Sequence, residues 1–278
     1  MTDLHCHTTA SDGLVSPTDI VRQAAGEGIA VLAIADHDTV NGLDAAVRTA
    51  QQEGIYLVPA IELSIAYPSG IFHLLGYGIQ YQNRAFREEL GRLKRIREDR
   101  IKRILEALNE AGIELSDHDV QNELNGDVPG KPHVARALVR KGYASDIQEA
   151  LRTYLNRGAP GYVAKEKIEP KAAFALIRGA GGFPVVAHPR SLNCNGFAEY
   201  DRFIQGCLDM GLAGIEAYAG IHDDEDVALF LELANQYDLV ATGGSDFHGD
   251  NGSRLGYYGD GRPIPETCSR SLLQLVGH

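Results

Sequence analysis

The chain has 278 residues, of which 44% are hydrophobic and 23% are charged, as is typical of one large or two smaller globular domains. It contains no run of eighteen apolar residues and no basic region followed by an apolar stretch, so we expect neither a membrane span nor a signal peptide. Four distant cysteines without a CxxC pair favour free thiols and a cytoplasmic location. The net charge of −12 disfavours phosphate-rich ligands unless bound cations attract them first.

Strand and helix patterns alternate through most of the chain. A first helix should begin after Ser16, because Pro17 suits the first helical position and Asp19 completes a capping pattern. Short apolar runs predict strands at 31–36, 56–65, 72–79, 183–188, 214–218 and 239–246. Further helices are predicted at 41–53, 170–179, 199–210 and 224–236. This alternation is typical of an α/β fold with a mainly parallel sheet, either open or closed into a barrel.

Residues 84–157 break this alternation and carry a net charge of +2, against −14 for the remainder of the chain. Residues 84–112, "RAFREELGRLKRIREDRIKRILEALNEAG", have apolar side chains every three or four positions before a glycine, which predicts one long helix. Shorter helical patterns follow near 116–124, 132–141 and 145–155. We interpret 84–157 as a small helical domain that is inserted into an α/β domain formed by 1–83 and 158–278.

Histidines and acidic residues gather at or near the C-terminal ends of the predicted strands, or in the loops that follow them. In "DLHCH" and "GSDFH", two potential ligands stand two positions apart, so they point to the same side of an extended chain. Loops that follow the strands of an α/β sheet or barrel meet at one mouth, which brings distant segments together. Imidazole and carboxylate groups suit zinc, manganese or iron better than calcium. The candidate metal ligands are His5, His7, Asp12, His37, Glu62, His73, His188, Asp246 and His248.

Neighbouring residues have less specific interpretations. Cys6 lies between two candidate ligands but should point to the opposite face, so we expect it to pack as a small hydrophobic residue. Asp36 and Asp38 flank His37 and are candidates to orient ligands through hydrogen bonds. Glu216 either orients a ligand or forms an ion pair in the core, and the sequence leaves both open. The remaining histidines outside the predicted site are expected at the surface: His118, His222 and His278.

The ordered motifs "DLHCHTTASDG", "ADHDT", Glu62 followed by His73, "AHP" and "GSDFH" resemble the PHP superfamily, named for polymerase and histidinol phosphatase domains. The resemblance covers 1–83 and 158–278. The inserted "GKPHVARALV" is similar to a bacterial branch of nucleoside 3′,5′-bisphosphate phosphatases related to 5′→3′ exoribonucleases.

This resemblance implies a distorted, TIM-like (β/α)7 barrel that holds three divalent metal ions. By motif, the first ion would be held by His5, His7, Glu62 and Asp246. The second would be held by Glu62, His73 and His188, and the third by Asp12, His37 and His248. The acid at Asp12, where some relatives have histidine, favours Mn²⁺ over Zn²⁺, and Fe²⁺ also suits these ligands.

Ions that lie close together lower the pKa of a shared water, which predicts hydrolysis of a phosphate ester. We expect a metal-activated hydroxide, held by Glu62, His188 and Asp246, to attack the phosphorus atom directly. The sequence has no G-x-S-x-G elbow and no Walker spacing, so it offers no motif for a competing mechanism.

The insertion should select the substrate. Pro132 suits the start of a helix, whose free N–H groups would lie beside Lys131 and His133, with Arg136 on the same face. We expect these three side chains to bind a second phosphate and Arg190 to contact the phosphate under attack. The alternative is a solvated helix start with an ordinary charged face.

The sequence thus favours removal of the 3′-phosphate of nucleoside 3′,5′-bisphosphates. Short RNA with a 5′-monophosphate presents the same groups and is a second candidate substrate. The alternatives are a histidinol-phosphate phosphatase and a catalytically silent module that binds metal or nucleic acid. The sequence shows no sign of an obligate protein partner.

Overall fold

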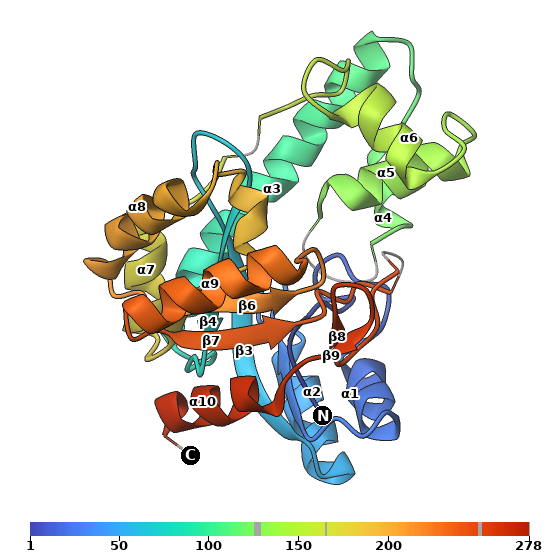
Figure 1. Ribbon diagram of the computed structural model, residues 1–278. Helices are drawn as coiled ribbons and strands as arrows, with labels where there is room; N and C mark the ends of the chain where they lie inside the picture. Colours follow the sequence, from blue (N-terminus) through green and yellow to red (C-terminus); the bar gives the residue numbers. More distant parts are fainter. Residues whose placement is uncertain (125–128, 165, 250–251, 278) are drawn as a thin grey trace.

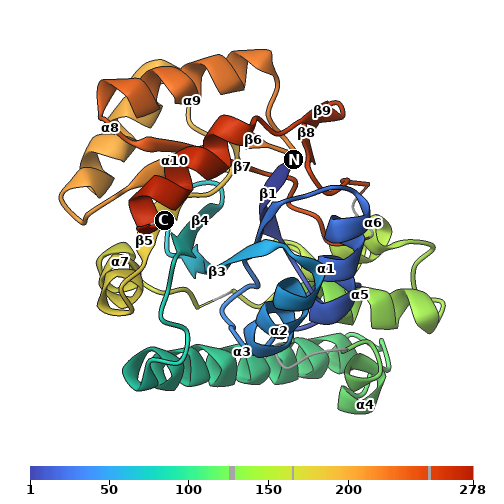
Figure 2. The same cartoon turned by 90° about the horizontal axis from the view of Figure 1, so that it is seen from below.

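The computed structural model describes residues 1–124, 129–164, 166–249 and 252–277. Seven strands form one sheet in chain order: β1 (Thr2–Cys6), β2 (Val31–Ile34), β3 (Tyr56–Ile65), β4 (Phe72–Tyr77), β5 (Phe183–Val186), β6 (Gly214–Ala219) and β7 (Val240–Gly244). The sheet curls until its first and last strands approach each other (Figure 2). A parallel bridge between Cys6 and Phe247 and a hydrogen bond from Asp246 N to His5 O (2.9 Å) nearly close the barrel. This confirms the predicted distorted α/β barrel.

Helices cover the outside of the sheet, and the predicted ones lie within a few residues of their expected bounds. They are α1 (Pro17–Gly26), α2 (Leu43–Glu53), α7 (Pro170–Gly179), α8 (Phe197–Leu208) and α9 (Asp224–Gln236). The cap at Ser16 is present, since its side chain accepts a hydrogen bond from Asp19 N. The sequence did not predict the β8–β9 hairpin (Tyr257–Tyr258 and Arg262–Pro263) or the helix α10 (Glu266–Val276).

Helix α10 closes the end of the barrel that lies opposite the helical insertion (Figure 1). Its buried Cys268 and Leu272 belong to one apolar cluster with Leu4 and Leu75 from the strands. Each fully buried leucine contributes on the order of 1.5–3 kcal/mol to folding. Because this end is filled with apolar side chains, polar residues at the other end can form a site on a rigid base.

Strand β4 runs antiparallel to both of its neighbours, whereas the other ladders of the seven-stranded sheet are parallel. Only residues 66–71 separate β3 from β4, and a parallel crossover needs a dozen or more residues. This reversal places His73 at the N-terminal end of its strand, not near the C-terminal end as the sequence analysis assumed. It still lies at the shared mouth, because it pairs with Ser64 near the C-terminal end of β3.

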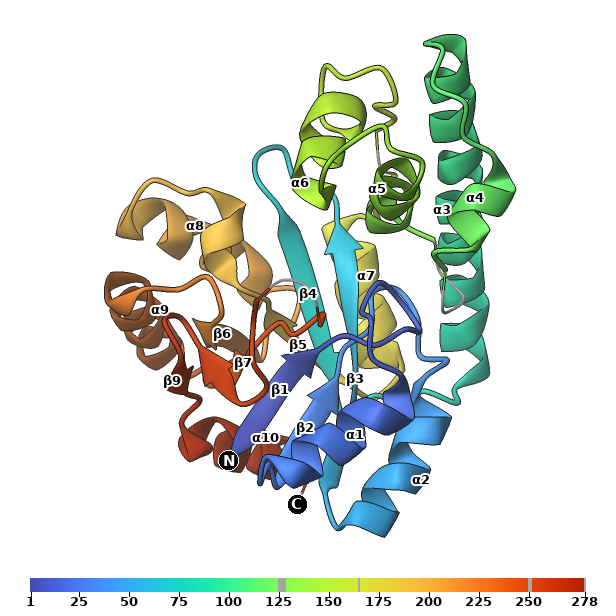
Figure 3. The same cartoon turned by 90° about the vertical axis from the view of Figure 1, so that its right-hand side faces the viewer.

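The insertion consists of α3 (Arg84–Glu110), α4 (Asp117–Gln121), α5 (Lys131–Arg140), α6 (Ile147–Ala150) and the π-helical turn η1 (Leu151–Leu155). The first half of α3 packs into the barrel core through Phe86 and Leu90. Its second half packs, through Ile104 and Leu108, into a separate apolar cluster with the other inserted helices. These helices stand over the mouth toward which the parallel strands point (Figure 3). The domain bounds 84–157 stay a prediction.

Among the described residues, no helix combines the length and the apolar character that crossing a lipid bilayer would require.

Candidate metal centre

All nine candidate ligands meet at the mouth of the barrel, although they come from six separate segments of the sequence. Four of them enclose one point, where His5 Nε2 lies 3.1 Å from His7 Nε2 and 3.5 Å from Glu62 Oε2. Asp246 Oδ1 lies 3.6 Å from His5 Nε2 and 3.1 Å from His7 Nε2, and His7 Nε2 lies 3.3 Å from Glu62 Oε2. The ligands of one tetrahedral ion, each about 2.0–2.1 Å from it, are separated by about 3.3–3.4 Å. The five separations among these four atoms are therefore close to those between the ligands of one ion, and we call the four residues the cage.

Glu62 extends the cluster with both of its carboxylate oxygens. Its Oε1 lies 2.9 Å from His73 Nδ1 and 3.0 Å from His188 Nε2. Its Oε2 lies 2.8 Å from His37 Nδ1 and also forms part of the cage. A carboxylate with imidazoles on both oxygens is placed to bridge two ions.

A further group surrounds Asp12. Its Oδ1 lies 3.5 Å from His248 Nε2 and 3.9 Å from His7 Nδ1, and its Oδ2 lies 3.9 Å from His37 Nε2. Suitable ligand atoms of these four residues all lie within 4.8 Å of one another. His7 faces both this group and the cage, so it connects the two groups of candidate ligands.

Unsatisfied polar atoms show that the cluster fits divalent cations. Within the described part of the chain, five buried ligand atoms form no hydrogen bond of suitable geometry, although three of them lie within 3 Å of an oppositely charged group or ring nitrogen: His7 Nδ1, Asp12 Oδ1, His37 Nδ1, Glu62 Oε2 and His73 Nδ1. Buried polar atoms without a partner are costly, and clusters of them need an explanation such as a bound ion. Nitrogen and carboxylate oxygen together form a donor set for transition metals.

The electrostatics keep the carboxylates of the cluster charged. Burial alone would raise the pKa of Glu62, but the adjacent His37, His73 and His5 lower it well below its usual value. The pKa of Asp246 is lowered in the same way, against burial, by His5 and His7. Burial lowers the pKa of His73 to about 4, whereas Glu216 and Glu62 raise the pKa of His5 against the effect of burial. A bound ion would therefore take the place of a proton at His5. Anionic carboxylates and neutral imidazole are the forms that bind metals.

Buried acids orient the ligands from behind. Glu216 is fully buried, lies 3.0 Å from His5 Nδ1 through Oε1, and accepts a hydrogen bond from His188 N (2.6 Å) through Oε2. Asp36 accepts hydrogen bonds from Thr8 N (2.8 Å) and Ser11 Oγ (2.6 Å) and so fixes the loop that carries Asp12. Of the two roles left open for Glu216, the structure therefore favours ligand orientation.

The backbone is strained at the site. Three non-glycine residues with positive φ lie in or next to the cluster: Asp38 (55°), His188 (25°) and Asp246 (53°). Such conformations are uncommon for non-glycine residues, although Asp and His adopt them more often than most, and they cost on the order of 1–3 kcal/mol each. Asp38 is held by an ion pair with Arg97 of α3 and by a hydrogen bond from Ser64 N (3.3 Å). The insertion thus contacts the loop that carries His37.

The structure agrees with the expected places of Cys6 and His118 but not with that of His222. Cys6 is buried and donates to Ala33 O (3.3 Å), as a structural thiol should. His118 is exposed as predicted, and His278 lies outside the described residues. The prediction of a surface His222 was wrong: it is 2% exposed, and its Nδ1 lies 2.9 Å from Ala217 O. Its acidic surroundings in the sequence concealed the fact that its ring packs on Phe230.

The four residues predicted to bind substrate do not all lie in the same cavity. Lys131 lines a cavity of about 390 Å³ that also touches three candidate ligands. His133 is buried, and its Nδ1 accepts from Gly130 N (3.0 Å) to cap α5. Arg136 is half-buried on the same helix. Arg190 points to the start of α9, where its Nη1 donates to Asp223 (2.8 Å) and Asp226 (2.6 Å).

The same cavity holds three cations that the sequence analysis missed: Arg97, Arg100 and Lys167. Arg100 is 7% exposed and donates to Val163 O (3.0 Å), but no carboxylate among the described residues pairs with it. Burial and then Arg97 lower the pKa of Arg100 to about 10. Burial and Arg100 lower the pKa of Lys131 and of Lys167. The cavity therefore joins a crowded set of cations to the candidate metal ligands.

The family model of the PHP domain matches residues 3–164, more than half of the chain. The chain belongs to the PHP domain family. Its relatives include a 3′,5′-nucleoside bisphosphate phosphatase from Chromobacterium violaceum, 33% identical over 97% of this chain and 95% of the relative. A 5′-3′ exoribonuclease from Haemophilus influenzae is 33% identical over 88% of this chain and 89% of the relative. A phosphoribosyl 1,2-cyclic phosphate 1,2-diphosphodiesterase from Eggerthella lenta is 33% identical over 90% and 95%.

Two solved structures share the whole architecture of this PHP-domain protein. One is an amidohydrolase from Chromobacterium violaceum with bound sulfate and no metal, with a TM-score of 0.86, 31% identity, and coverage of 99% of this chain and 96% of the other. The other is described as a metal-dependent phosphoesterase from Bifidobacterium adolescentis, with a TM-score of 0.86, 28% identity, and coverage of 98% and 95%. The coverage includes the helical insertion, so the insertion belongs to the shared fold.

Proposed function

We propose that this PHP-domain protein is a metal-dependent phosphoesterase that removes the 3′-phosphate from nucleoside 3′,5′-bisphosphates. The cage of His5, His7, Glu62 and Asp246, together with the groups around Glu62 and Asp12, would hold three divalent ions, with Mn²⁺ favoured and Fe²⁺ or Zn²⁺ also compatible. When bound, such ions lower the pKa of water and neutralise phosphoryl oxygens. The free thiols of all four cysteines support a reducing, cytoplasmic setting.

One observation carries the choice of substrate. The cations Arg97, Arg100, Lys131 and Lys167 line the same cavity as Asp12, His37 and His73. Burial and Arg100 lower the pKa of Lys131 and of Lys167. Such crowded cations favour binding of an anion, because the anion relieves their mutual repulsion. A substrate with one phosphate at the metal ligands and a second phosphate at the cations would satisfy both ends of the cavity. A nucleoside 3′,5′-bisphosphate has this form.

The protein's own residues would position and hold the substrate. The cationic cluster would bind the 5′-phosphate, and Tyr162 and Ile71, which also line the cavity, would contact the apolar faces of the nucleoside. Glu216 and Asp36 would keep the ligand side chains in place. Water attacks the phosphorus atom, the bond from phosphorus to the 3′ oxygen breaks, and that oxygen leaves as a hydroxyl.

Other activities fit the geometry less well. Histidinol phosphate carries one phosphate and would leave Arg100 and its neighbours without an anion. A catalytically silent module would not need a complete set of nine ligand residues. The named activities of the relatives from Haemophilus influenzae and Eggerthella lenta are also phosphoester cleavages, which supports the reaction class and leaves the substrate to experiment.

The test compares substrates that differ by one phosphate. Purified protein, stripped with a chelator and reloaded with Mn²⁺, should hydrolyse adenosine 3′,5′-bisphosphate, and histidinol phosphate should be a poor substrate. Lys131→Ala should raise KM for the bisphosphate about tenfold or more and leave KM for adenosine 3′-monophosphate nearly unchanged, since a hydrogen bond to a charged group contributes about 1.5–3 kcal/mol. Lys102→Ala, on an exposed side chain of α3, is the matched control. Equal changes on both substrates would refute the two-phosphate arrangement.

A further inference from the structure

The hydroxyl group of Ser191 stands between a candidate metal ligand and a loop that borders the substrate cavity. Ser191 lies in the short 3₁₀ turn η2 (Pro189–Leu192), which begins directly after His188. Its Oγ lies 2.9 Å from His188 Nδ1 and 2.9 Å from Ile71 O. We propose that Ser191 is a positioning residue that keeps a proton on His188 Nδ1, so that His188 Nε2 presents its lone pair to a metal ion. The inference rests on the proposed function, in which His188 is a metal ligand.

The direction of these two hydrogen bonds follows from the carbonyl group at one end. The oxygen of Ile71 can only accept, so the hydroxyl proton of Ser191 points to it. Oγ then has only lone pairs left for His188, and its contact with Nδ1 is a hydrogen bond only if Nδ1 carries a proton. A serine that donated to Nδ1 would instead leave two oxygens facing each other at 2.9 Å without a proton between them. The geometry therefore favours the form of His188 that is protonated at Nδ1.

The other ring nitrogen of His188 faces the ligand cluster. Its Nε2 lies 3.0 Å from Glu62 Oε1, an oxygen that His73 Nδ1 also approaches at 2.9 Å. A lone pair on Nε2 and a carboxylate oxygen repel each other unless a proton or a metal ion lies between them. A ring proton that moved from Nδ1 to Nε2 would compete with a metal ion for this place, and the Ser191 hydroxyl holds that proton on the far side. Metal-bound histidines commonly donate their other N–H to a partner, which fixes the tautomer and the ring orientation.

The backbone of His188 is held independently of its ring. Its N–H donates to Glu216 Oε2 (2.6 Å), and its carbonyl oxygen accepts from Ser191 N (2.9 Å). These bonds fix a residue whose φ is 25°. Among the described residues, only the Ser191 hydroxyl forms a hydrogen bond with Nδ1. The position of the main chain thus depends on Glu216 and η2, whereas the tautomer of the ring depends on Ser191.

The loop that supplies the carbonyl group is fastened to η2. Ile71 N donates to Ser191 O (2.7 Å), so Ile71 and Ser191 are joined by hydrogen bonds in both directions. Gly70 has a φ of 66°, and a Cβ at this position would lie 2.3 Å from Leu192 O. Only glycine permits so close an approach of the two segments. Residues 66–71 are therefore held where the Ile71 carbonyl can orient the Ser191 hydroxyl.

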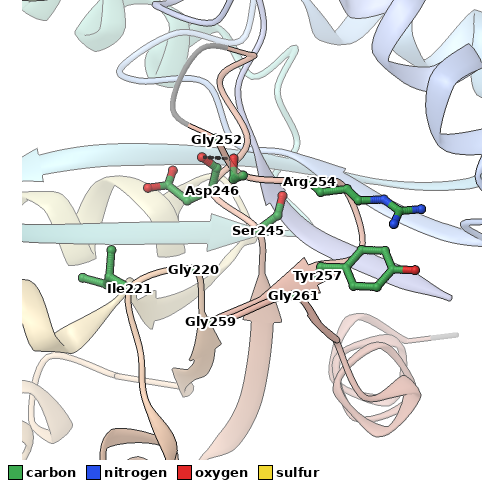
Figure 4. A pocket seen from close by; sticks show the side chains of 10 residues that line it. Gly220, Ile221, Ser245, Asp246, Gly252, Arg254, Tyr257, Gly259 and Gly261 are labelled. Atoms are coloured by element: carbon green, nitrogen blue, oxygen red, sulfur yellow. Dashed lines mark hydrogen bonds between the residues drawn. The ribbon is translucent and has the colours of Figure 1, made fainter.

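Ile71 also connects these hydrogen bonds with the place where the substrate would bind. Its side chain is 49% exposed and lines the cationic cavity and a central cavity of about 220 Å³, which His188 and Ser191 also border. Ile221 and Asp246 border the central cavity as well, and they continue into a neighbouring pocket of about 350 Å³ (Figure 4). Because Ser191 faces a cavity and not the apolar core, its hydroxyl can be removed without opening a hole in the interior.

The first experiment measures metal binding in variants of Ser191. In calorimetric titration of the chelator-stripped protein with Mn²⁺, Ser191→Ala should bind at least one ion about tenfold more weakly, as is typical when a ligand loses its orienting partner. Ser191→Thr keeps a hydroxyl group and should keep the affinity of the unsubstituted protein. Ser271→Ala, on α10, is the matched control and should also bind Mn²⁺ normally.

The second experiment observes the proton itself, which a mere packing role of Ser191 would not affect. In Zn²⁺-loaded protein with ¹⁵N-labelled histidine, nuclear magnetic resonance should show His188 with a protonated Nδ1 and an unprotonated Nε2. His188→Gln identifies the signal by removing it. In Ser191→Ala, this proton should exchange with water about tenfold faster, as expected for the loss of one hydrogen bond.

A substitution in the loop tests the carbonyl end of the same chain of hydrogen bonds. Gly70→Ala should push the loop and its Ile71 carbonyl away from η2, because the new Cβ would lie 2.3 Å from Leu192 O. The His188 proton should then exchange faster than in the unsubstituted protein. Adding Ser191→Ala to Gly70→Ala should change the exchange rate little, because both substitutions interrupt one chain of contacts.

The outcomes separate this inference from the proposed function. The inference falls if Ser191→Ala keeps the Mn²⁺ affinity or leaves the exchange of the Nδ1 proton unchanged. It also falls if Ser191→Thr loses as much affinity as Ser191→Ala. Expected effects in the Ser191 variants, without hydrolysis of adenosine 3′,5′-bisphosphate by the unsubstituted protein, would overturn the proposed substrate and leave the role of Ser191 standing. A protein that binds neither Mn²⁺ nor Zn²⁺ would overturn both.

Discussion

Glu216 lies behind two candidate ligands, and Glu216→Gln should weaken metal binding without removing any ligand. Both of its carboxylate oxygens are in use, one at 3.0 Å from His5 Nδ1 and one at 2.6 Å from His188 N. An amide has only one oxygen, so one of these contacts must be lost. If the amide nitrogen faces His5, Nδ1 becomes the acceptor and the ring proton moves to Nε2, the atom that points into the cage. If it faces His188, a buried N–H loses its partner.

Loss of such an orienting partner typically reduces metal affinity 10- to 100-fold, which corresponds to about 1.4–2.7 kcal/mol. Calorimetric titration of the metal-free protein with Mn²⁺, and metal content after dialysis, would measure this change. Glu232→Gln, on an exposed side chain of α9, is the control for the same substitution elsewhere. An unchanged affinity in Glu216→Gln would show that Glu216 has only a packing role.

Two further substitutions test the fold around the site. Gly244→Ala should lower the free energy of unfolding by about 1–3 kcal/mol or more and reduce the metal content, because the new Cβ would lie 2.1 Å from His5 Cβ. The control is Gly26→Ala, whose Cβ would meet no atom within 4 Å, so its denaturant midpoint should stay almost unchanged. Burial lowers the pKa of His222, so the unfolded state binds more protons and stability is lost as the pH falls through about 6.5. In urea unfolding, the His222→Gln variant should therefore lose less stability between pH 7 and pH 5 than the unsubstituted protein. An equal loss of stability in both proteins would contradict this reasoning.

The candidate ligands could be found from the sequence because strand geometry alone determines much of their placement. Glu62 and His73 lie on neighbouring strands, where the two-residue period turns them to the inner face above buried apolar residues such as Ala60 and Leu75. Their common location did not depend on the direction of β4, which the sequence analysis did not predict. Motif spacing is therefore a more robust guide to this site than strand order.

The cationic cavity could not be found in the same way. On a long amphipathic helix with many charges, Arg97 and Arg100 resemble members of a solvated face, although their i, i+3 spacing places them together. Only tertiary packing buries Arg100 against Val163, which follows the insertion in the chain. Lys167 lies beyond the insertion, and no local pattern connects it with them. Burial of a charge depends on contacts between distant segments, which local sequence does not encode.

The continuous helix α3 restricts how the substrate can reach the site. Its 27 residues span about 40 Å, with one end embedded in the barrel and the other in the small helical domain. Arg97 and Arg100 lie on this helix between its two anchored ends, so the groups that would hold the distal phosphate cannot swing away as a separate lid. Under the proposed function, the distance between the two phosphate positions would thereby be set before any substrate arrives, and α3 would favour substrates whose phosphates have this separation.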